Sequence, residues 1–125
     1  MEEENVSRNR IAVAIGIVAI FVLVGGILIY ADAGSHRGHN LTFDVVVSSA
    51  QTMHPSNMPA RQNDTVTINL NSDRDGEVHL HVYDIQFAAH ANQVVSHTFK
   101  ADKTCTCDIE WESTSTPLGT LTVSP

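Results

Sequence analysis

Residues 77–84, Glu-Val-His-Leu-His-Val-Tyr-Asp, decide the fold, because a period-two hydrophobic pattern coincides there with two histidines. In a β-strand successive side chains point to opposite faces. His79, His81 and Tyr83 would then share one face, and the aliphatic residues between them the other. Two imidazoles about 6.5–7 Å apart on one pleated face could bind a metal ion, or they could be solvated side chains.

The chain around this stretch has the pattern of short strands separated by turn residues. In residues 78–87 the apolar residues occupy even-numbered positions up to residue 82 and odd-numbered positions from residue 85. This change near Tyr83 and Asp84 indicates a β-bulge or a bend between two sheets. Residues 48–62 contain Pro55 and Pro59, so we expect an irregular crossing there. Residues 78–87 are predicted to form a strand or a strand pair. The other predicted strands are residues 42–47, 65–70, 94–100, 105–112 and 118–123. Six or seven short strands of this kind predict an all-β sandwich or barrel.

The first 40 residues have a different composition. Residues 11–31 contain no charged side chain, and about 20 apolar residues in a helix span the ~30 Å hydrocarbon layer of a membrane. We therefore predict a short tail (1–10), a transmembrane anchor (11–31), a flexible linker (32–40) and a β domain (41–125). Residues 31–33, Ala-Asp-Ala, also resemble the cleavage site of a signal peptide, so removal of the helix remains an alternative.

Charge sets the expected location and partners. Arg8 and Arg10 precede the apolar run and favour a cytoplasmic N-terminus, which places the β domain outside the cytoplasm on a single-pass protein of the cell membrane. From Leu41 onward ten acidic residues face four Lys or Arg, a net charge of −6. This acidic balance argues against a nucleic-acid partner. The expected partners are the membrane and a protein at the membrane.

Five motifs lie along the predicted β domain: residues 63–68 (NDTVTI), 72–73 (SD), 77–84 (EVHLHVYD), 98–102 (TFKAD) and 119–125 (GTLTVSP). Together they resemble those of the cupredoxin-like domains of single-pass membrane-anchored or secreted bacterial proteins. The resemblance covers residues 41–125 and implies a Greek-key β-sandwich or barrel. That family includes both copper carriers and metal-free members, so the fold alone does not determine function.

The resemblance places His79 where blue copper proteins have their first histidine ligand. Those proteins complete the site from a late loop that supplies Cys, then His, then Met, a combination that holds copper in a trigonal geometry. Here the corresponding loop is residues 111–117 (WESTSTP), and no Cys, His or Met follows Glu110. A complete blue copper centre is therefore not expected.

The remaining candidate metal ligands are His79 and His81, because imidazole suits copper, zinc or nickel. We expect copper as the ion, and a chain without any metal is the alternative. Residues that could complete the site are Glu77, Tyr83, His90, His97, Glu110 and Glu112.

Two further groups contain possible ligands. Met53, His54 and Met58 combine thioether and imidazole donors, which suit Cu(I), although such residues also serve as loop packing. Cys105 and Cys107 lie one residue apart on a predicted strand. They could pack in the core as small apolar groups, form a disulfide, or supply thiolates to a metal.

The sequence contains no nucleophile elbow, Gly-rich phosphate loop or recognisable pair of catalytic carboxylates. We therefore expect no enzyme. The predicted function is a membrane-tethered, extracytoplasmic domain that binds a metal ion for holding or delivery. The alternative is a metal-free accessory or interaction module of a membrane assembly, with exposed sheet edges available for pairing.

Overall fold

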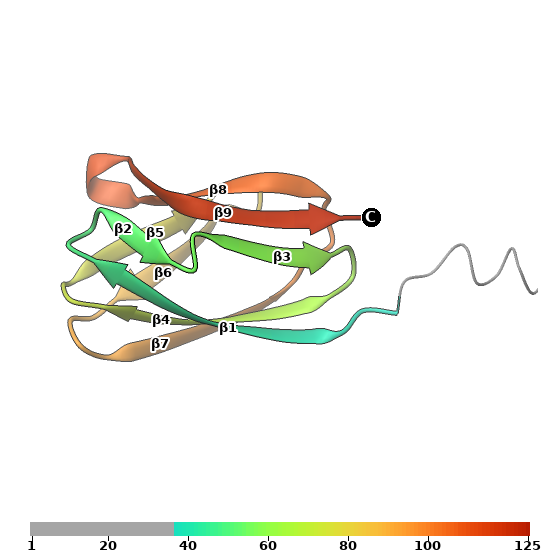
Figure 1. The fold of residues 1–125 in the computed structure, drawn as a ribbon, viewed down its shortest axis with the longest axis horizontal. Coiled ribbons are helices and arrows are strands. Elements are labelled where there is room, and N and C mark those ends of the chain that lie inside the picture. The colour runs from blue at the N-terminus through green and yellow to red at the C-terminus, as the bar shows by residue number, and fades with distance from the viewer. Residues whose placement is uncertain (1–36) are drawn as a thin grey trace, which may run out of the picture. The chain divides into compact units, whose positions relative to one another are not determined.

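Nine β-strands form two facing sheets in residues 37–125, the part of the chain that the computed structural model describes (Figure 1). The four-stranded sheet has the order β2 (Thr52–His54), β1 (Asn40–Ser48), β4 (Thr65–Ser72) and β7 (Val94–Lys100). The five-stranded sheet has the order β3 (Asn57–Arg61), β9 (Thr116–Ser124), β8 (Cys105–Trp111), β5 (Gly76–Leu80) and β6 (Ile85–Ala89). The predicted all-β sandwich is confirmed.

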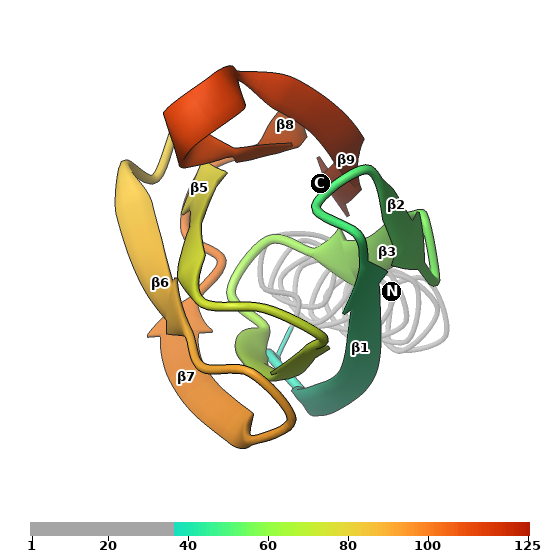
Figure 2. The same ribbon diagram turned by 90° about the vertical axis from the view of Figure 1, so that its left-hand side faces the viewer.

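The chain passes repeatedly from one sheet to the other, which ties the two layers together. β1 and β4 pair in parallel, as do β3 and β9, whereas the other pairs are antiparallel. Viewed along the sandwich, β6 of one sheet approaches β7 of the other, so the layers nearly close on that side (Figure 2).

Strict alternation of side chains builds the core, as β4 shows. Val66, Ile68 and Leu70 are at most 4% exposed and face the opposite sheet. Thr67 and Asn69, between them, point outward and form hydrogen bonds across the sheet surface. Full burial of one such aliphatic side chain contributes roughly 1.5–3 kcal/mol to folding. The predicted strand at residues 65–70 is confirmed.

Residues 48–62 do not form the irregular crossing that their prolines predicted. They contain β2, which pairs with the end of β1, and β3, which pairs with β9. Pro59 lies within β3, and it is tolerated because β3 is an edge strand and a proline there removes no hydrogen bond from a central ladder.

Residues 78–87 form a hairpin of two strands within one sheet, so the predicted strand pair is confirmed and the predicted bulge or bend between two sheets is wrong. β5 ends at Leu80, a four-residue turn follows, and β6 returns with Ile85 opposite Leu80. Val82 and Asp84 have φ angles of 71° and 52°, in the left-handed region, so the turn breaks the strand alternation. As a result Val82 is 54% exposed instead of joining the apolar face.

The predicted cytoplasmic tail and the anchor at residues 11–31 lie outside the described residues, as does most of the linker. Within residues 37–125 no helix is long and apolar enough to cross a membrane. The helix found there is the short 3-10 turn η1 (Glu112–Thr114), between β8 and β9.

A buried aspartate holds three strand ends together. The side chain of Asp64 is 4% exposed, and its two oxygens accept hydrogen bonds from the backbone N–H groups of His39 and Arg61, each at 2.8 Å. Its backbone carbonyl accepts a third, from Ala101 N–H, at 2.8 Å. His39 precedes β1, Arg61 ends β3 and Ala101 follows β7, so this one residue joins both sheets.

Replacing Asp64 should therefore destabilise the whole domain. We expect Asp64→Ala to lower the free energy of unfolding by about 3 kcal/mol, because two backbone donors lose a charged acceptor. Urea unfolding of the full chain measures the change. The control is Asp44→Ala, which removes an exposed aspartate that accepts a hydrogen bond from Asn69 and should cost about 1 kcal/mol or less. Equal effects of the two substitutions would contradict the role of Asp64.

Candidate metal centre

The pairing of β5 with β8 gathers ionisable side chains on the outer face of the five-stranded sheet. His79 lies directly opposite Glu110 in this antiparallel pair. Its neighbours Val78 and Leu80 point into the core, where each is at most 3% exposed. His81 lies one residue beyond β5, but its N–H donates to the carbonyl of Asp108 at 2.9 Å. The ladder is thereby extended, and the two imidazoles lie on the same side of the sheet.

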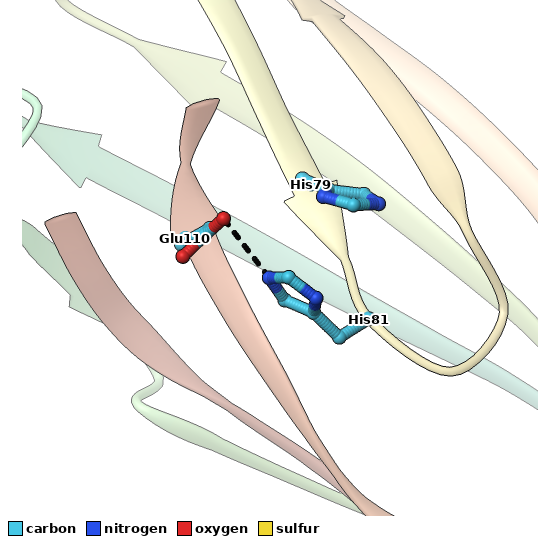
Figure 3. A group of neighbouring side chains, drawn as sticks. All are labelled: His79, His81 and Glu110. Atoms are coloured by element: carbon cyan, nitrogen blue, oxygen red, sulfur yellow. Dashed lines mark ion pairs between the residues drawn. The ribbon is translucent and has the colours of Figure 1, made fainter. Parts of the chain in front are cut away.

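The two histidines and Glu110 form a compact group (Figure 3). The ring centroids of His79 and His81 are 4.4 Å apart, and Nε2 of His81 lies 3.0 Å from Oε1 of Glu110. One possible ligand atom from each of the three residues lies within 4.8 Å of the other two, and no other group of His, Cys, Asp or Glu in residues 37–125 meets this condition. The side chains are 15%, 41% and 22% exposed respectively, so an ion could reach them from solvent.

Two more carboxylates flank the ring of His79. Oδ1 of Asp84, in the hairpin turn, lies 2.9 Å from Nε2 and forms a hydrogen bond with it. Oε2 of Glu112, in η1, lies 3.2 Å from Nδ1. This Oε2 atom is buried and accepts no hydrogen bond. Its partner in the structure is Nδ1 of His79, with which it forms an ion pair.

This donor set fits a transition-metal ion. Imidazole nitrogen and carboxylate oxygen bind zinc and copper at about 2.0–2.2 Å, so neighbouring donors around one ion lie roughly 3 Å apart. The pair His81 and Glu110 has this spacing, at 3.0 Å. Glu112 lies 3.2 Å from His79 but is not part of the converging group. The carboxylate of Asp84 resembles the outer-shell acceptors that orient metal-bound histidines through their second ring nitrogen.

The turn that carries His81 and Asp84 is fixed to the loop before β8. Tyr83 donates from its hydroxyl group to the carbonyl of Lys103 at 2.7 Å and accepts from Lys103 N–H at 3.0 Å. Its ring packs against Phe99, with a centroid distance of 5.2 Å. Burial raises the pKa of Tyr83 above its ordinary value, which keeps the hydroxyl protonated as the donor that this contact needs.

Several other sequence-predicted candidates lie away from this group. Met53 and Met58 are 7% and 0% exposed and belong to the core, whereas His54 points outward from β2. Their side chains therefore do not face one solvent-accessible point. His90 is exposed at the end of β6, and His97 packs against the ring of Phe87, with a centroid distance of 5.0 Å.

Cys105 and Cys107 form a disulfide. Of the three alternatives that the sequence left open, the structure therefore contains the bridge, and neither sulfur is a thiolate. Their Cα atoms are 5.3 Å apart, closer than the roughly 6.5–7 Å of alternate residues in an extended strand, which brings them within the usual range for a disulfide.

Sequence reasoning missed the part that Asp84 plays. The sequence does contain a sign of this contact. The alternation of apolar and polar residues breaks at Tyr83 and Asp84, where the chain turns and brings Asp84 back to His79. Without the left-handed backbone of this turn, alternation along a strand would have put His79 and Asp84 on opposite faces.

Comparison with solved structures supports the fold. The metal-binding domain, with Cu(I), of the Cu(I)-exporting P-type ATPase CopA of Streptococcus pneumoniae matches with a TM-score of 0.59 and 9% identity, over 73% of this chain and 100% of that one. A copper-binding protein in its apo form matches with a TM-score of 0.57 and 7% identity, over 71% and 91% of the two chains. A chain of a haem-copper terminal oxidase dimer matches with a TM-score of 0.56 and 13% identity, over 88% and 96%.

The fold is thus similar to that of cupredoxin-like copper proteins. No protein-family model matches the sequence, and no curated protein matches it. At these low identities the likeness concerns the fold alone.

Removing the hydroxyl group of Tyr83 should loosen the turn beside the site. We expect Tyr83→Phe to lower the free energy of unfolding by about 1 kcal/mol, because two hydrogen bonds to the Lys103 backbone are lost. Urea unfolding again provides the measurement. Lys103→Ala is the matched control, since it keeps both backbone hydrogen bonds and removes only an ammonium group 5.5 Å from the tyrosine ring. A larger loss for Lys103→Ala than for Tyr83→Phe would refute this account.

Proposed function

We propose that this chain is a membrane-tethered, extracytoplasmic domain that binds a copper ion for holding or delivery. The observation that carries the proposal is the convergence of His79, His81 and Glu110 on the outer face of one sheet. The cupredoxin-like fold adds support, because two structures that share it belong to a copper-binding protein and to a Cu(I)-exporting ATPase. Tethering and location are inferred from the uncharged run at residues 11–31 and from Arg8 and Arg10.

The exposure of the site favours exchange of the ion over catalysis. His81 is 41% exposed and Glu110 is 22% exposed, so a partner or chelator could approach the ion directly. Both cysteines of the chain are in a disulfide, and a blue copper centre needs a copper–thiolate bond. We therefore propose neither a blue electron-transfer centre nor an enzyme. The acidic domain, with its net charge of −6, supports a role without nucleic acid.

A second candidate function is a metal-free accessory module of a membrane assembly. The specific observation in its favour is the matching chain of a haem-copper terminal oxidase, which is covered over 96% of its length by 88% of this chain. The match therefore includes most of the residues of both chains. On this alternative the carboxylates of Asp84, Glu110 and Glu112 would serve only as ion-pair partners of the two imidazoles.

A copper titration tests the first function. Trp111, the single tryptophan of the sequence, lies between Glu110 and Glu112, and we expect Cu(II) to quench its fluorescence as the site fills. His79→Ala and His81→Ala should each weaken copper affinity at least about tenfold, because one of two imidazole donors is lost. The copper-loaded chain should show no intense visible copper–thiolate band.

The matched control is His90→Ala, which removes an exposed histidine outside the group and should leave copper affinity unchanged. If the native chain binds no copper, or if both site substitutions behave like His90→Ala, the metal function is wrong and the accessory role is favoured. The native fluorescence spectrum of metal-free Trp111 in each variant verifies that the domain still folds.

A further inference from the structure

We infer that the end of the sandwich at which β1 begins binds anionic phospholipid headgroups and so orients the domain on the membrane. This inference deepens the proposed function and rests on its membrane tether, but not on the bound metal. It assigns a membrane contact to the β domain itself, in addition to the uncharged run at residues 11–31.

Three segments meet at this end of the sandwich, which we call the entry end. Asp64 holds them together through its hydrogen bonds to the backbone of His39, Arg61 and Ala101. Figure 1 shows the beginning of β1 and the end of β3 at the same end of the sandwich. The entry end consists of residues 37–39, 61–64 and 100–103.

The charge of the entry end is opposite to that of the rest of the domain. Two of the ten acidic residues in residues 37–125 belong to it, Asp64 and Asp102, and Asp64 is buried. The entry end therefore has a formal side-chain charge of +2, whereas the rest of the domain has −7. Four of the five Lys and Arg residues in residues 37–125 belong to the entry end, namely Arg37, Arg61, Lys100 and Lys103.

The four cationic side chains of the entry end are available to a partner. All are exposed, and within residues 37–125 none of them forms an ion pair with a carboxylate. By contrast Arg74, in the loop between β4 and β5 at the opposite end, has its Nε 3.4 Å from Oδ1 of Asp73. The ammonium group of Lys103 lies 5.5 Å from the ring centroid of Tyr83, a contact that leaves its charge in place.

The tether brings the entry end close to the membrane. Five residues, 32–36, separate the predicted anchor from Arg37, and a chain of this length reaches at most about 20 Å. Tethering gives the entry end a high effective concentration of lipid. Electrostatic attraction that is too weak to recruit a free domain is therefore sufficient to orient this one.

Screening by salt keeps the acidic groups of the candidate metal centre from cancelling this attraction. Glu110 lies five residues along β8 from Cys105, where the strand begins beside the entry end. At about 3.3 Å per residue the separation is about 17 Å, roughly two Debye lengths at physiological ionic strength. A surface that contacts the entry end is thus attracted by its cations more than it is repelled by Glu110. The carboxylate of Asp84, in the neighbouring turn, is hydrogen-bonded to His79.

Acetylation of the full chain in lipid nanodiscs tests the inference, because both lysines of the sequence, Lys100 and Lys103, belong to the entry end. Acetic anhydride, an uncharged reagent, is applied in discs of phosphatidylcholine alone and in discs that also contain phosphatidylglycerol. Mass spectrometry then measures the modification of each lysine. We expect acetylation to be at least about fivefold slower in the anionic discs, since the cations are attracted to that surface. High salt should abolish the difference.

Two substitutions leave both reporter lysines in place. Arg37→Gln and Arg61→Gln should each reduce the protection of the lysines at least about twofold, because each removes one of the attracted cations. The matched control is Arg74→Gln, which removes the same charge at the opposite end and should leave the protection unchanged. The fluorescence of Trp111, which is 4% exposed, verifies that each variant still folds.

The outcomes separate this inference from the proposed function. Equal acetylation in the two kinds of disc, or a difference that high salt does not change, would overturn the binding of anionic headgroups while the tether and the copper function stand. So would Arg37→Gln and Arg61→Gln variants that both behave like Arg74→Gln. Failure of the full chain to enter the discs would overturn the tether and this inference together, and the copper titration reports on the metal function separately.

Discussion

The pairing of β5 with β8 is the constraint on which both the core and the candidate site depend. With His79 opposite Glu110, Val78 and Trp111 meet on the inner face, as do Leu80 and Ile109. A slip of one residue would turn every side chain to the other face. It would bury two imidazoles and a carboxylate and expose the aliphatic residues. Burial of the hydrophobic residues therefore fixes the register, and the register in turn places the ionisable groups together.

Much of this arrangement could be predicted from the sequence, because alternation is a local property. The pattern of β4 and the outward direction of His79 and His81 follow from hydrophobic residues at every second position. Glu110 and Glu112 could be named as candidates for the same reason. The sequence could not show which of the candidates converge, since that depends on the β5 and β8 register and on η1, which are contacts between distant segments.

The features that escaped prediction have local causes that override the pattern. Val82 is a β-branched residue in the left-handed region, where such residues are rarely found, so the sequence suggested a strand where the chain turns. β2 and β3 have only three and five residues and lie next to or contain prolines, so their pairing with β1 and β9 had no clear signal. The disulfide depends on a Cα separation shorter than that of a regular strand.

The position of the site bears on the kind of copper chemistry that it can support. Three of its groups, His79, Glu110 and Glu112, are on or next to paired strands, whereas His81 and Asp84 belong to one turn. A site assembled in this way combines groups on the strands with two groups on a turn that Tyr83 holds against the backbone of Lys103. Because the candidate ligands are nitrogen and oxygen atoms that solvent can reach, an ion held there would be more accessible than one enclosed by a thiolate. The proposed holding or delivery of an ion would leave the ladder of β5 and β8 in place, because the hydrophobic side chains on its inner face fix that ladder independently of the ion.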